Sequence, residues 1–538
     1  MAQEWWRDAV IYQIYPRSFQ DTNGDGIGDL KGITDRLEYV ASLGVDAIWL
    51  SPFFTSPDLD MGYDVSDYTG VNPLFGTLDD FDALIDRAHA LGLRVIIDQV
   101  LSHSSNEHPW FVESRSNRTN PKADWYVWAD PKADGTAPNN WLSVFGGSAW
   151  QFDTRRKQYY LHNFLTEQPD LNFHNPEVVD ALLETMRFWL DRGVDGFRLD
   201  TVNFYVHDKE LRDNPPSGWE HFPNNPYEAQ DQIFSKSRPE NIDVLRRMRA
   251  LTDAYEDRMM VGEVGEMGRQ IDIMAEYTSG GDKLHMAYSF EFLSHLHSAE
   301  HFRSRIAKFL DKAPDGWPCW SFSNHDVQRH AARWTPKGGD SDAVAKQSIA
   351  MLASFPGTLN IYQGEELGQT ETDIEFHELM DTANIDFWPE YKGRDGCRTP
   401  MVWDSSEPYA GFSDAKPWLP IKAPQAARAR SLQENNGESV LNAYRETLGF
   451  RKAQPALRFG ATQFLDLPEP VLGIQRALDG QGVTAFFNLS DATVALSLSS
   501  AGKAIGPRLA TVEGEGVTLP AFGFVYLEGL LEAAVSEA

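Results

Sequence analysis

Four short apolar runs in the sequence each end on an acidic residue, and these acids are the groups best suited to chemistry. They are Asp98, Asp200, Glu263 and Asp326. Such runs suit strands buried on both faces of a parallel sheet, and the carboxyl edge of that sheet is the reactive face of an α/β barrel. Helix-capping or turn acids would explain one or two of the four. The repetition favours a shared site.

Several acids at one edge repel each other and are costly to desolvate, which separates their pKa values. A retaining glycosidase needs one ionised carboxylate as nucleophile and one protonated carboxyl as acid, roughly 5 Å apart. Asp200, Glu263 and Asp326 fit that requirement. Arg198 lies two positions before Asp200, on the same strand face, where its charge would keep Asp200 ionised.

The order of the predicted elements indicates how these acids are positioned. Strand-like runs alternate with amphipathic stretches such as 78–91, 176–192 and 342–355. Eight strands alternating with helices predict a (β/α)8 TIM barrel, an α/β fold. The eight runs are 9–19, 46–52, 94–100, 196–200, 259–264, 287–292, 318–326 and 357–364.

Two gaps are too long for simple barrel connections, and the pattern changes near the end of the chain. Short alternating runs after the helix-like stretch 438–453 predict an antiparallel β domain. The predicted domains are a barrel at 1–103 and 173–457, a subdomain inserted after the third strand at 104–172, an extended segment at 369–434 within the barrel domain, and a C-terminal β-sandwich at 458–538.

The bulk composition excludes several partners. A net charge of −31 over 538 residues argues against nucleic-acid binding, which needs a basic face. We expect no secretory signal, because the first residues lack a basic start and an apolar core. No apolar run reaches the 18 residues of a membrane span. Two cysteines do not make a disulfide framework, so the expected location is the reducing cytoplasm.

Several segments together resemble a known family. Residues 98–103, 196–200, 261–264 and 322–326 resemble, in order and spacing, the four signature regions of the α-amylase family of glycoside hydrolases. Residues 168–172 resemble a fifth region in its oligo-1,6-glucosidase form. The likeness continues through 356–366 and 394–401, so it covers nearly the whole chain. It points to the oligo-1,6-glucosidase and α-glucosidase subfamily, closest to bacterial α-glucosidases with transglucosylation activity.

The resemblance implies roles for individual residues. Asp200 matches the nucleophile, Glu263 the general acid/base and Asp326 the carboxylate that stabilises the transition state. Asp98 either touches substrate or orients its neighbours, and for Glu365 and Glu366 a structural role is favoured. The residues matched to the pocket around the first glucose are Asp60, Tyr63, His103, Phe145, Phe164, Arg198, His325 and Arg394. For the aromatic residues, the alternative to a place in the pocket is packing in the core. For each histidine, the alternative is a structural role.

The residue after the nucleophile bears on linkage. In the resembled subfamily valine accompanies α-1,6 action, and a smaller polar residue accompanies α-1,4 action. Here the residue is Thr201, whose hydroxyl can bind a sugar hydroxyl of the next unit. We therefore expect α-1,4 substrates such as maltose, with sucrose as a further candidate. The loop at 203–235 should shape the acceptor site.

The expected activity is that of a retaining, exo-acting α-glucosidase that releases or transfers a terminal glucosyl unit through a covalent intermediate. Its partners would be small oligosaccharides or glucosides and alcohol acceptors. One alternative is a sucrose- or trehalose-converting enzyme on the same scaffold. Isomerase activity is disfavoured because the Arg-Leu-Asp-Arg pattern of sucrose isomerases is absent after Asp326. An inactive, transporter-associated relative is disfavoured by the complete set of acids.

A separate loop has the pattern of a metal site. Its oxygen donors alternate with glycines: Asp21, Asn23, Asp25, the carbonyl of Ile27, and Asp29. This alternation is typical of a calcium-binding loop, although the last acid comes at position 9 and no EF-hand helix pair is evident. The resembled subfamily carries Ca²⁺ or Mg²⁺ here. We expect a structural ion and no organic cofactor.

Overall fold

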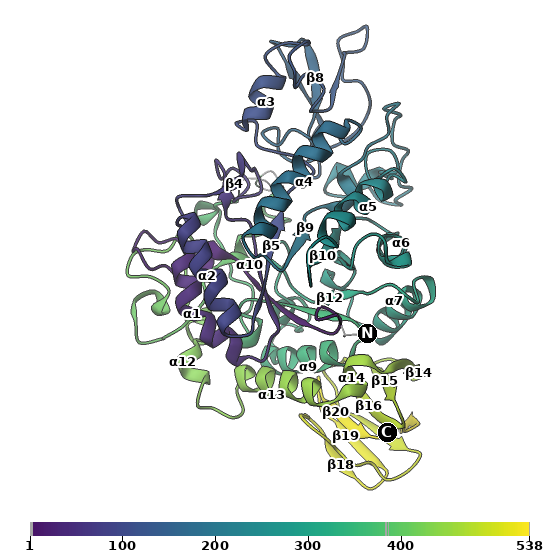
Figure 1. Ribbon diagram of the computed structural model, residues 1–538. Coiled ribbons are helices and arrows are strands. Elements are labelled where there is room, and N and C mark those ends of the chain that lie inside the picture. The colour runs from purple at the N-terminus through teal and green to yellow at the C-terminus, as the bar shows by residue number, and fades with distance from the viewer. Residues whose placement is uncertain (1–3, 382–384, 386, 537–538) are drawn as a thin grey trace.

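A computed structural model describes residues 4–381, 385 and 387–536 of the protein. The residues left out lie at the two chain ends and inside the predicted segment 369–434. The described part contains a central barrel, a small subdomain beside its mouth and a β domain at the opposite end of the molecule (Figure 1).

The barrel consists of eight parallel strands, which confirms the predicted fold. The strand order is β11-β10-β9-β5-β2-β1-β13-β12, and a parallel bridge between Ala287 and Pro318 joins the two ends of the sheet. The strands are short and buried on both faces, as the apolar runs predicted. They are β1 (Val10–Ile14), β2 (Ala47–Leu50), β5 (Arg94–Gln99), β9 (Gly196–Leu199), β10 (Met259–Val264), β11 (Met286–Ser289), β12 (Cys319–Ser321) and β13 (Thr358–Tyr362).

Helices between the strands cover the outside of the barrel, and α2 illustrates how the sequence defines one. Thr77 and Asp80 form a capping box at its start, and Phe81 and Leu84 lie on its buried face. The covering helices are α1 (Leu30–Ser42), α2 (Leu78–Ala90), α4 (Pro176–Asp191), α5 (Asn241–Thr252), α6 (Gln270–Thr278), α7 (Ala299–Lys312), α8 (His330–Arg333) and α9 (Ser341–Ser354).

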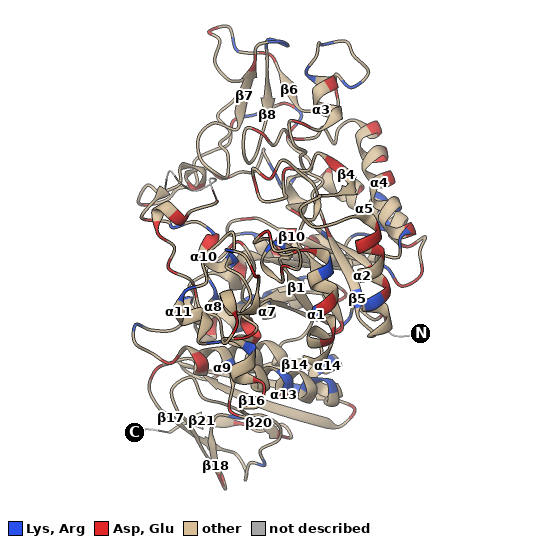
Figure 2. Cartoon of the chain, turned by 90° about the vertical axis from the view of Figure 1, so that its left-hand side faces the viewer, with Lys and Arg blue, Asp and Glu red and all other residues tan. Residues whose placement is uncertain are grey.

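Charged residues are spread over this helical surface. Acidic residues recur along α2 and α4 with basic ones among them (Figure 2). In the part of the chain that the structure describes, no helix is long and apolar enough to cross a membrane.

The chain between β5 and α4 forms the inserted subdomain. It contains α3 (Pro109–Ser114) and a three-stranded antiparallel sheet of β6 (Trp128–Ala129), β8 (Gln158–Leu161) and β7 (Trp150–Asp153). Its small core is rich in aromatic residues such as Trp141 and Trp150. An antiparallel backbone bridge between His103 and Asp170 joins the end of the subdomain to the loop after β5, next to the barrel mouth.

Short elements after β13 lead from the barrel to the C-terminal domain. They include η6 (Glu365–Leu367), α10 (Asp395–Arg398), α11 (Ala423–Ala426), α12 (Arg430–Gln433), α13 (Val440–Ala453) and α14 (Pro455–Phe459). Other short elements lie near the mouth, namely β3 (Phe54–Thr55), β4 (Asp67–Val71), η2 (Val202–Phe204), η3 (Pro226–Ala229) and η5 (Phe290–Leu293).

The C-terminal region consists of two four-stranded antiparallel sheets, which confirms the predicted β domain. Alternating residues such as Phe486, Leu496, Val517 and Val525 form a core of their own. One sheet contains β14 (Ala461–Leu465), β15 (Val471–Leu478), β16 (Gln481–Asn488) and β20 (Phe524–Glu528). The other contains β18 (Thr511–Glu513), β19 (Gly516–Leu519), β17 (Val494–Leu498) and β21 (Ala533–Val535).

Buried polar groups attach this domain to the barrel. The guanidinium of Arg476, on β15, donates to the carbonyls of Ser354 and Gly460 at 2.8 and 3.0 Å. The hydroxyl of Tyr526, on β20, donates to the carbonyl of Ala350 at 2.6 Å. Since Ser354 ends α9, the Arg476 charge also lies at the negative end of that helix.

We expect Arg476→Met to lower the free energy of unfolding by about 1–3 kcal/mol, because it leaves buried carbonyls without donors. Arg508→Met is the matched control, since Arg508 lies exposed in the same domain. Thermal denaturation should show a lower midpoint for Arg476→Met and an unchanged midpoint for Arg508→Met. Equal midpoints for all three proteins would contradict the anchoring role of Arg476.

Candidate active site

A single cavity of about 1090 Å³ opens at the carboxyl ends of the barrel strands. The three predicted catalytic acids reach it from three different strands, although they are far apart in the sequence. The predicted site residues that line the cavity are Asp60, Tyr63, His103, Phe145, Phe164, Asp200, Thr201, Glu263, Asp326 and Arg394. Arg198 and His325 are fully buried behind this lining.

Arg198 connects the acids from below. Its Nη1 lies 2.6 Å from Asp200 Oδ1 and 2.8 Å from Asp98 Oδ1, and its Nη2 lies 2.7 Å from Glu263 Oε1. The guanidinium also donates to the hydroxyl of Tyr288 at 2.9 Å, and that hydroxyl donates to Glu263 at 3.1 Å. One positive charge therefore holds three carboxylates in a buried cluster.

The charge balance of this cluster favours one retained proton. Burial raises the pKa of Glu263 to about 7, and the Arg198 charge only partly opposes this effect. Burial likewise raises the pKa of Asp200, while Arg198 opposes it. The Asp200 charge is also among the causes that raise the pKa of Glu263, so the protonation of one acid affects that of the other. Near neutral pH the pair can therefore supply one ionised and one protonated carboxyl.

The turn at Thr201 links the two acids directly. This residue has φ 40° and ψ 46°, a left-handed conformation that is uncommon for a β-branched side chain. Its N–H donates to Glu263 Oε2 at 3.1 Å, and its hydroxyl donates to Asp200 Oδ2 at 3.2 Å. The hydroxyl also lies 2.9 Å from the hydroxyl of Ser102.

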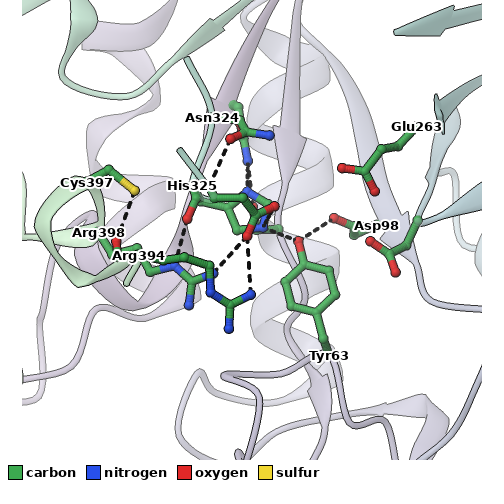
Figure 3. A network of polar contacts seen from close by, with 12 residues as sticks. Tyr63, Asp98, Glu263, Asn324, His325, Arg394, Cys397 and Arg398 are labelled. Carbon is green, nitrogen blue, oxygen red and sulfur yellow. Dashed lines mark hydrogen bonds and ion pairs between the residues drawn. The ribbon is translucent and has the colours of Figure 1, made fainter. Parts of the chain in front are cut away.

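Two parallel aromatic rings lie between Asp98 and Asp326. Tyr63 and His325 lie parallel with centroids 5.3 Å apart, and the Tyr63 hydroxyl lies 2.5 Å from His325 Nε2 and 3.2 Å from Asp98 Oδ2 (Figure 3). The Gln13 amide donates to His325 Nδ1 at 2.8 Å. Burial lowers the pKa of His325 to about 3, so the ring is neutral and its Nε2–H donates to Tyr63. Asp98 thus orients its neighbours and does not line the cavity.

Asp326 occupies a positive corner of the site. Burial alone would raise its pKa, but neighbouring positive groups such as Arg394 and Arg398 hold that pKa below its ordinary value. Arg398 Nη2 lies 3.0 Å from Asp326 Oδ1, and Arg394 Nη1 lies 3.4 Å from the same oxygen. Asp326 is therefore the acid of the three that is most firmly ionised.

Arg394 also closes the inner end of the cavity. Its Nη2 lies 2.7 Å from Asp60 Oδ1, and its Nε lies 2.6 Å from Asp381 Oδ2. Gln168 donates to the second oxygen of Asp60 at 2.9 Å. The Arg394 guanidinium lies over the ring of Phe145, 5.2 Å from its centroid. Asp60 and Arg394, two of the predicted pocket residues, thus form a direct ion pair.

An aromatic wall continues from His103. Its ring centroid lies 5.1 Å from that of Phe164, which in turn lies 5.8 Å from Phe145 and 5.4 Å from Phe204. Burial lowers the pKa of His103 to about 4, so this histidine is neutral. Its ring nitrogens contact Ser102 and the carbonyl of Tyr63.

Sequence reasoning missed several residues of the site. Arg398 comes four positions after Arg394, so helical spacing could have identified it as a second cation on the same face. Tyr288, near the end of β11, could have been found from strand alternation. Asp381 gave no such signal, because it lies 13 positions before Arg394 in a segment without regular periodicity. Gln168 begins the region 168–172 that resembles a signature region, but its contact with Asp60 joins segments 108 positions apart and was not predicted.

The predicted metal loop lies between η1 (Pro16–Ser18) and α1, apart from the cavity lining. The loop curls around Asp21, whose carboxylate accepts the N–H groups of Asn23, Gly24 and Gly26. Asp29 caps α1 by accepting from Gly32 N–H at 2.6 Å. Among the residues described, no group of three or more Asp, Glu, His or Cys side chains is arranged to hold a metal ion. A metal site in this loop would therefore need backbone and amide oxygens, from Ile27 and Asn23, together with the carboxylates.

Comparison with known proteins agrees with this geometry. A probable α-glucosidase of Rhizobium meliloti (strain 1021) is 56% identical over 537 residues, covering 97% of this chain and 96% of that protein. The solved structure of the α-glucosyl transfer enzyme XgtA is 51% identical, with a TM-score of 0.94, and covers 98% of this chain and 100% of its own. Isomaltulose synthase from Erwinia rhapontici NX5 is 33% identical, with a TM-score of 0.88, and covers 99% and 100%.

The family model of the alpha amylase catalytic domain matches residues 13–460, which span the barrel and the inserted subdomain. All three predicted catalytic acids and the whole Arg198 cluster lie inside this match. The chain therefore belongs to the α-amylase family of glycoside hydrolases.

Proposed function

We propose that the protein is a retaining α-glucosidase that cleaves a terminal α-glucosyl unit from short glucosides and passes it to water or to an alcohol. The observation that carries this proposal is the sharing of one buried guanidinium by Asp200 and Glu263. A shared cation favours the short separation, roughly 5 Å, of a retaining pair over the wider separation of an inverting pair.

In the first step Glu263 protonates the glycosidic oxygen while Asp200 attacks the anomeric carbon. Asp200 Oδ1 is held by Arg198, so Oδ2, on the Thr201 side, is the oxygen with the weaker contact. Asp326, which Arg394 and Arg398 keep ionised, accepts hydrogen bonds from hydroxyls of the glucose ring. The leaving group departs with the proton of Glu263, and a glucosyl ester of Asp200 remains.

In the second step the ionised Glu263 accepts a proton from the incoming hydroxyl. That oxygen attacks the anomeric carbon and releases Asp200, so the original stereochemistry is restored. Arg198 stabilises whichever of the two carboxylates is ionised, because it contacts both.

The closed inner end supports exo action. Asp60 and Arg394 bridge the cavity beyond the first sugar, where a longer chain would have to continue. Both residues are largely buried, so opening this end would separate the Asp60 carboxylate from its ion-pair partner. The enzyme should remove single glucose units from chain ends.

Thr201 supports preference for α-1,4 linkages. Its hydroxyl lines the cavity between Asp200 and Ser102 and can exchange its contact with Ser102 for one with a hydroxyl of the second sugar. A dedicated sucrose- or trehalose-converting enzyme is the second candidate, and the likeness to isomaltulose synthase supports keeping it in the product analysis.

We further propose that the loop from Asp21 to Asp29 holds one Ca²⁺ or Mg²⁺ ion. Its donors are all oxygens: three carboxylates, the Asn23 amide and the Ile27 carbonyl, and hard cations prefer such sets. The ion would brace the loop that starts α1. It is distant from the cavity lining and would be structural.

The two cysteines support a reducing location. Cys319 and Cys397 are both buried free thiols that form no disulfide. Thiols that stay unpaired are the usual state in the cytoplasm, so we propose that compartment.

Glu263→Gln should lower kcat/KM for maltose by roughly 10²–10⁴, because the leaving sugar loses its proton donor. In the wild type, kcat/KM should fall as the pH rises through about 7, where Glu263 loses its proton. The variant should lack this alkaline limb. Initial rates across pH on maltose and on α-glucosyl fluoride, whose leaving group needs little protonation, measure both effects.

Asp200→Ala serves as the contrasting variant, because it should lose activity on both donors. Azide added to the Glu263 variant should yield the α-glucosyl azide, since the glucosyl-enzyme still forms. A β-product from that variant, or full activity of the Asp200 variant, would refute the assignment of roles.

Thr201→Val should reduce the ratio of maltose to isomaltose turnover by roughly tenfold, because the second sugar loses a hydrogen-bond partner. Thr201→Ser keeps the hydroxyl and should retain the ratio. Product chromatography with both substrates gives the measurement. An unchanged ratio in the valine variant would count against the linkage proposal.

Removing divalent cations with a chelator should lower the thermal midpoint, and adding Ca²⁺ or Mg²⁺ should restore it. A ligand at 100 times its Kd stabilises the folded state by about 2.7 kcal/mol. Asp25→Ala should abolish the response, while Asp491→Ala, an exposed acid in the C-terminal domain, should retain it. An unchanged thermal midpoint after chelation would contradict the proposed ion.

A further inference from the structure

The cavity continues beyond the residues that surround the first glucose, and its outer wall is largely aromatic. Its volume of about 1090 Å³ slightly exceeds the usual range for ligand sites, roughly 300–1,000 Å³. Four segments supply this wall: the loop after β9, the loop after β10, the start of η5 and the segment before Arg394. Its apolar members are Phe204, Trp219, Phe222, Pro223, Tyr227, Met267, Phe290, Phe387 and Tyr391.

Several of these rings are exposed to an extent that packing does not explain. Phe222 is 76% exposed, Trp219 is 54% exposed and Tyr391 is 43% exposed. Large exposed apolar side chains gathered on the wall of one cavity indicate a binding surface. Trp219 and Phe222 belong to the loop at 203–235, which the sequence placed near the acceptor site.

Two polar side chains of the outer wall, those of Asn225 and Lys236, are held by protein partners. Asn225 donates to the carbonyl of Val144 and accepts from Tyr227 N–H. Lys236 is buried and donates to the hydroxyl of Tyr227 and the carbonyl of Gly265, at 2.9 and 2.8 Å. The exposed rings therefore remain as the main apolar surface that this end offers to a bound molecule.

The charge of the outer wall is negative. Glu220, Glu228 and Glu390 line it, while Lys236 is enclosed and engaged. A carboxylate or phosphate on the bound molecule would be repelled here.

We propose that the outer part of the cavity binds an uncharged aromatic alcohol, which serves as the glucosyl acceptor and, in the reverse direction, as the aglycone. This inference rests on the proposed α-glucosidase function. The rings of Trp219 and Phe222 stack on the aromatic group and leave its hydroxyl directed toward Glu263. Offset or edge-to-face stacking of this kind is favourable beyond the area that it buries.

The transfer step is balanced without a further reactant. The bond between the anomeric carbon and the Asp200 carboxylate oxygen breaks, and a bond from that carbon to the alcohol oxygen forms. The proton of the alcohol passes to Glu263. Asp200 is released as a carboxylate, and the product is the aryl-alkyl α-glucoside.

The test uses α-glucosyl fluoride as donor, because fluoride does not occupy the outer cavity. Benzyl alcohol, n-propanol and 4-(hydroxymethyl)benzoate are compared as acceptors at equal concentration. Benzyl alcohol should give roughly tenfold more transfer relative to hydrolysis than n-propanol, since only it stacks. The benzoate, which carries a negative charge on the same ring, should give roughly tenfold less than benzyl alcohol.

Trp219→Ala and Phe222→Ala should each lower the benzyl alcohol ratio several-fold and leave the n-propanol ratio nearly constant. Val112→Ala is the matched control, because Val112 is 51% exposed on α3 and does not line the cavity. Equal use of benzyl alcohol and n-propanol, or unchanged ratios in both aromatic variants, would overturn the proposal.

The two proposals fail differently in this experiment. An enzyme that releases no fluoride lacks the α-glucosidase function itself. An enzyme that releases fluoride and hydrolyses the intermediate, but shows no aromatic preference, retains that function and refutes only the acceptor proposal.

Discussion

One buried guanidinium is the constraint on which the site depends. Arg198 is fully buried and contacts Asp98, Asp200 and Glu263 at 2.6 to 2.8 Å. Three carboxylates in a dry environment could not all ionise without it, and one cation is too little charge to neutralise all three. The cluster therefore keeps a proton near neutral pH. Cleavage with retention needs that state, in which one acid is charged and its neighbour is not.

The barrel makes this arrangement possible because its strands end at one edge. β9 supplies Arg198 and leads into Asp200, β10 supplies Glu263, and β5 supplies Asp98. The strands are fixed in register by parallel pairing, so Asp98 lies opposite Arg198. Rigid elements thus position the charges, and the loops above them define which molecules enter.

The two ends of the cavity recognise different chemistry. The inner end carries ionised partners for sugar hydroxyls and is closed by the ion pair of Asp60 and Arg394. The outer end has exposed rings such as Trp219 and Phe222 on a longer loop. The inner end is formed largely by residues in the matched signature regions, and the outer end lies outside them. We infer that glucose recognition is set by the barrel and acceptor choice by the loop.

The sequence by itself determined the barrel, its strands and the set of acids, because short buried strands and parallel pairing leave a strong local pattern. It also identified the C-terminal sheets from their alternation. Only the tertiary structure decided that Arg198 and His325 lie behind the cavity, and that Arg398, Asp381 and Tyr288 complete the network. Contacts such as that of Arg394 with Asp60 join residues far apart along the chain, so no local periodicity records them. The exposure of Trp219 and Phe222 likewise depends on how the loop at 203–235 folds over the mouth.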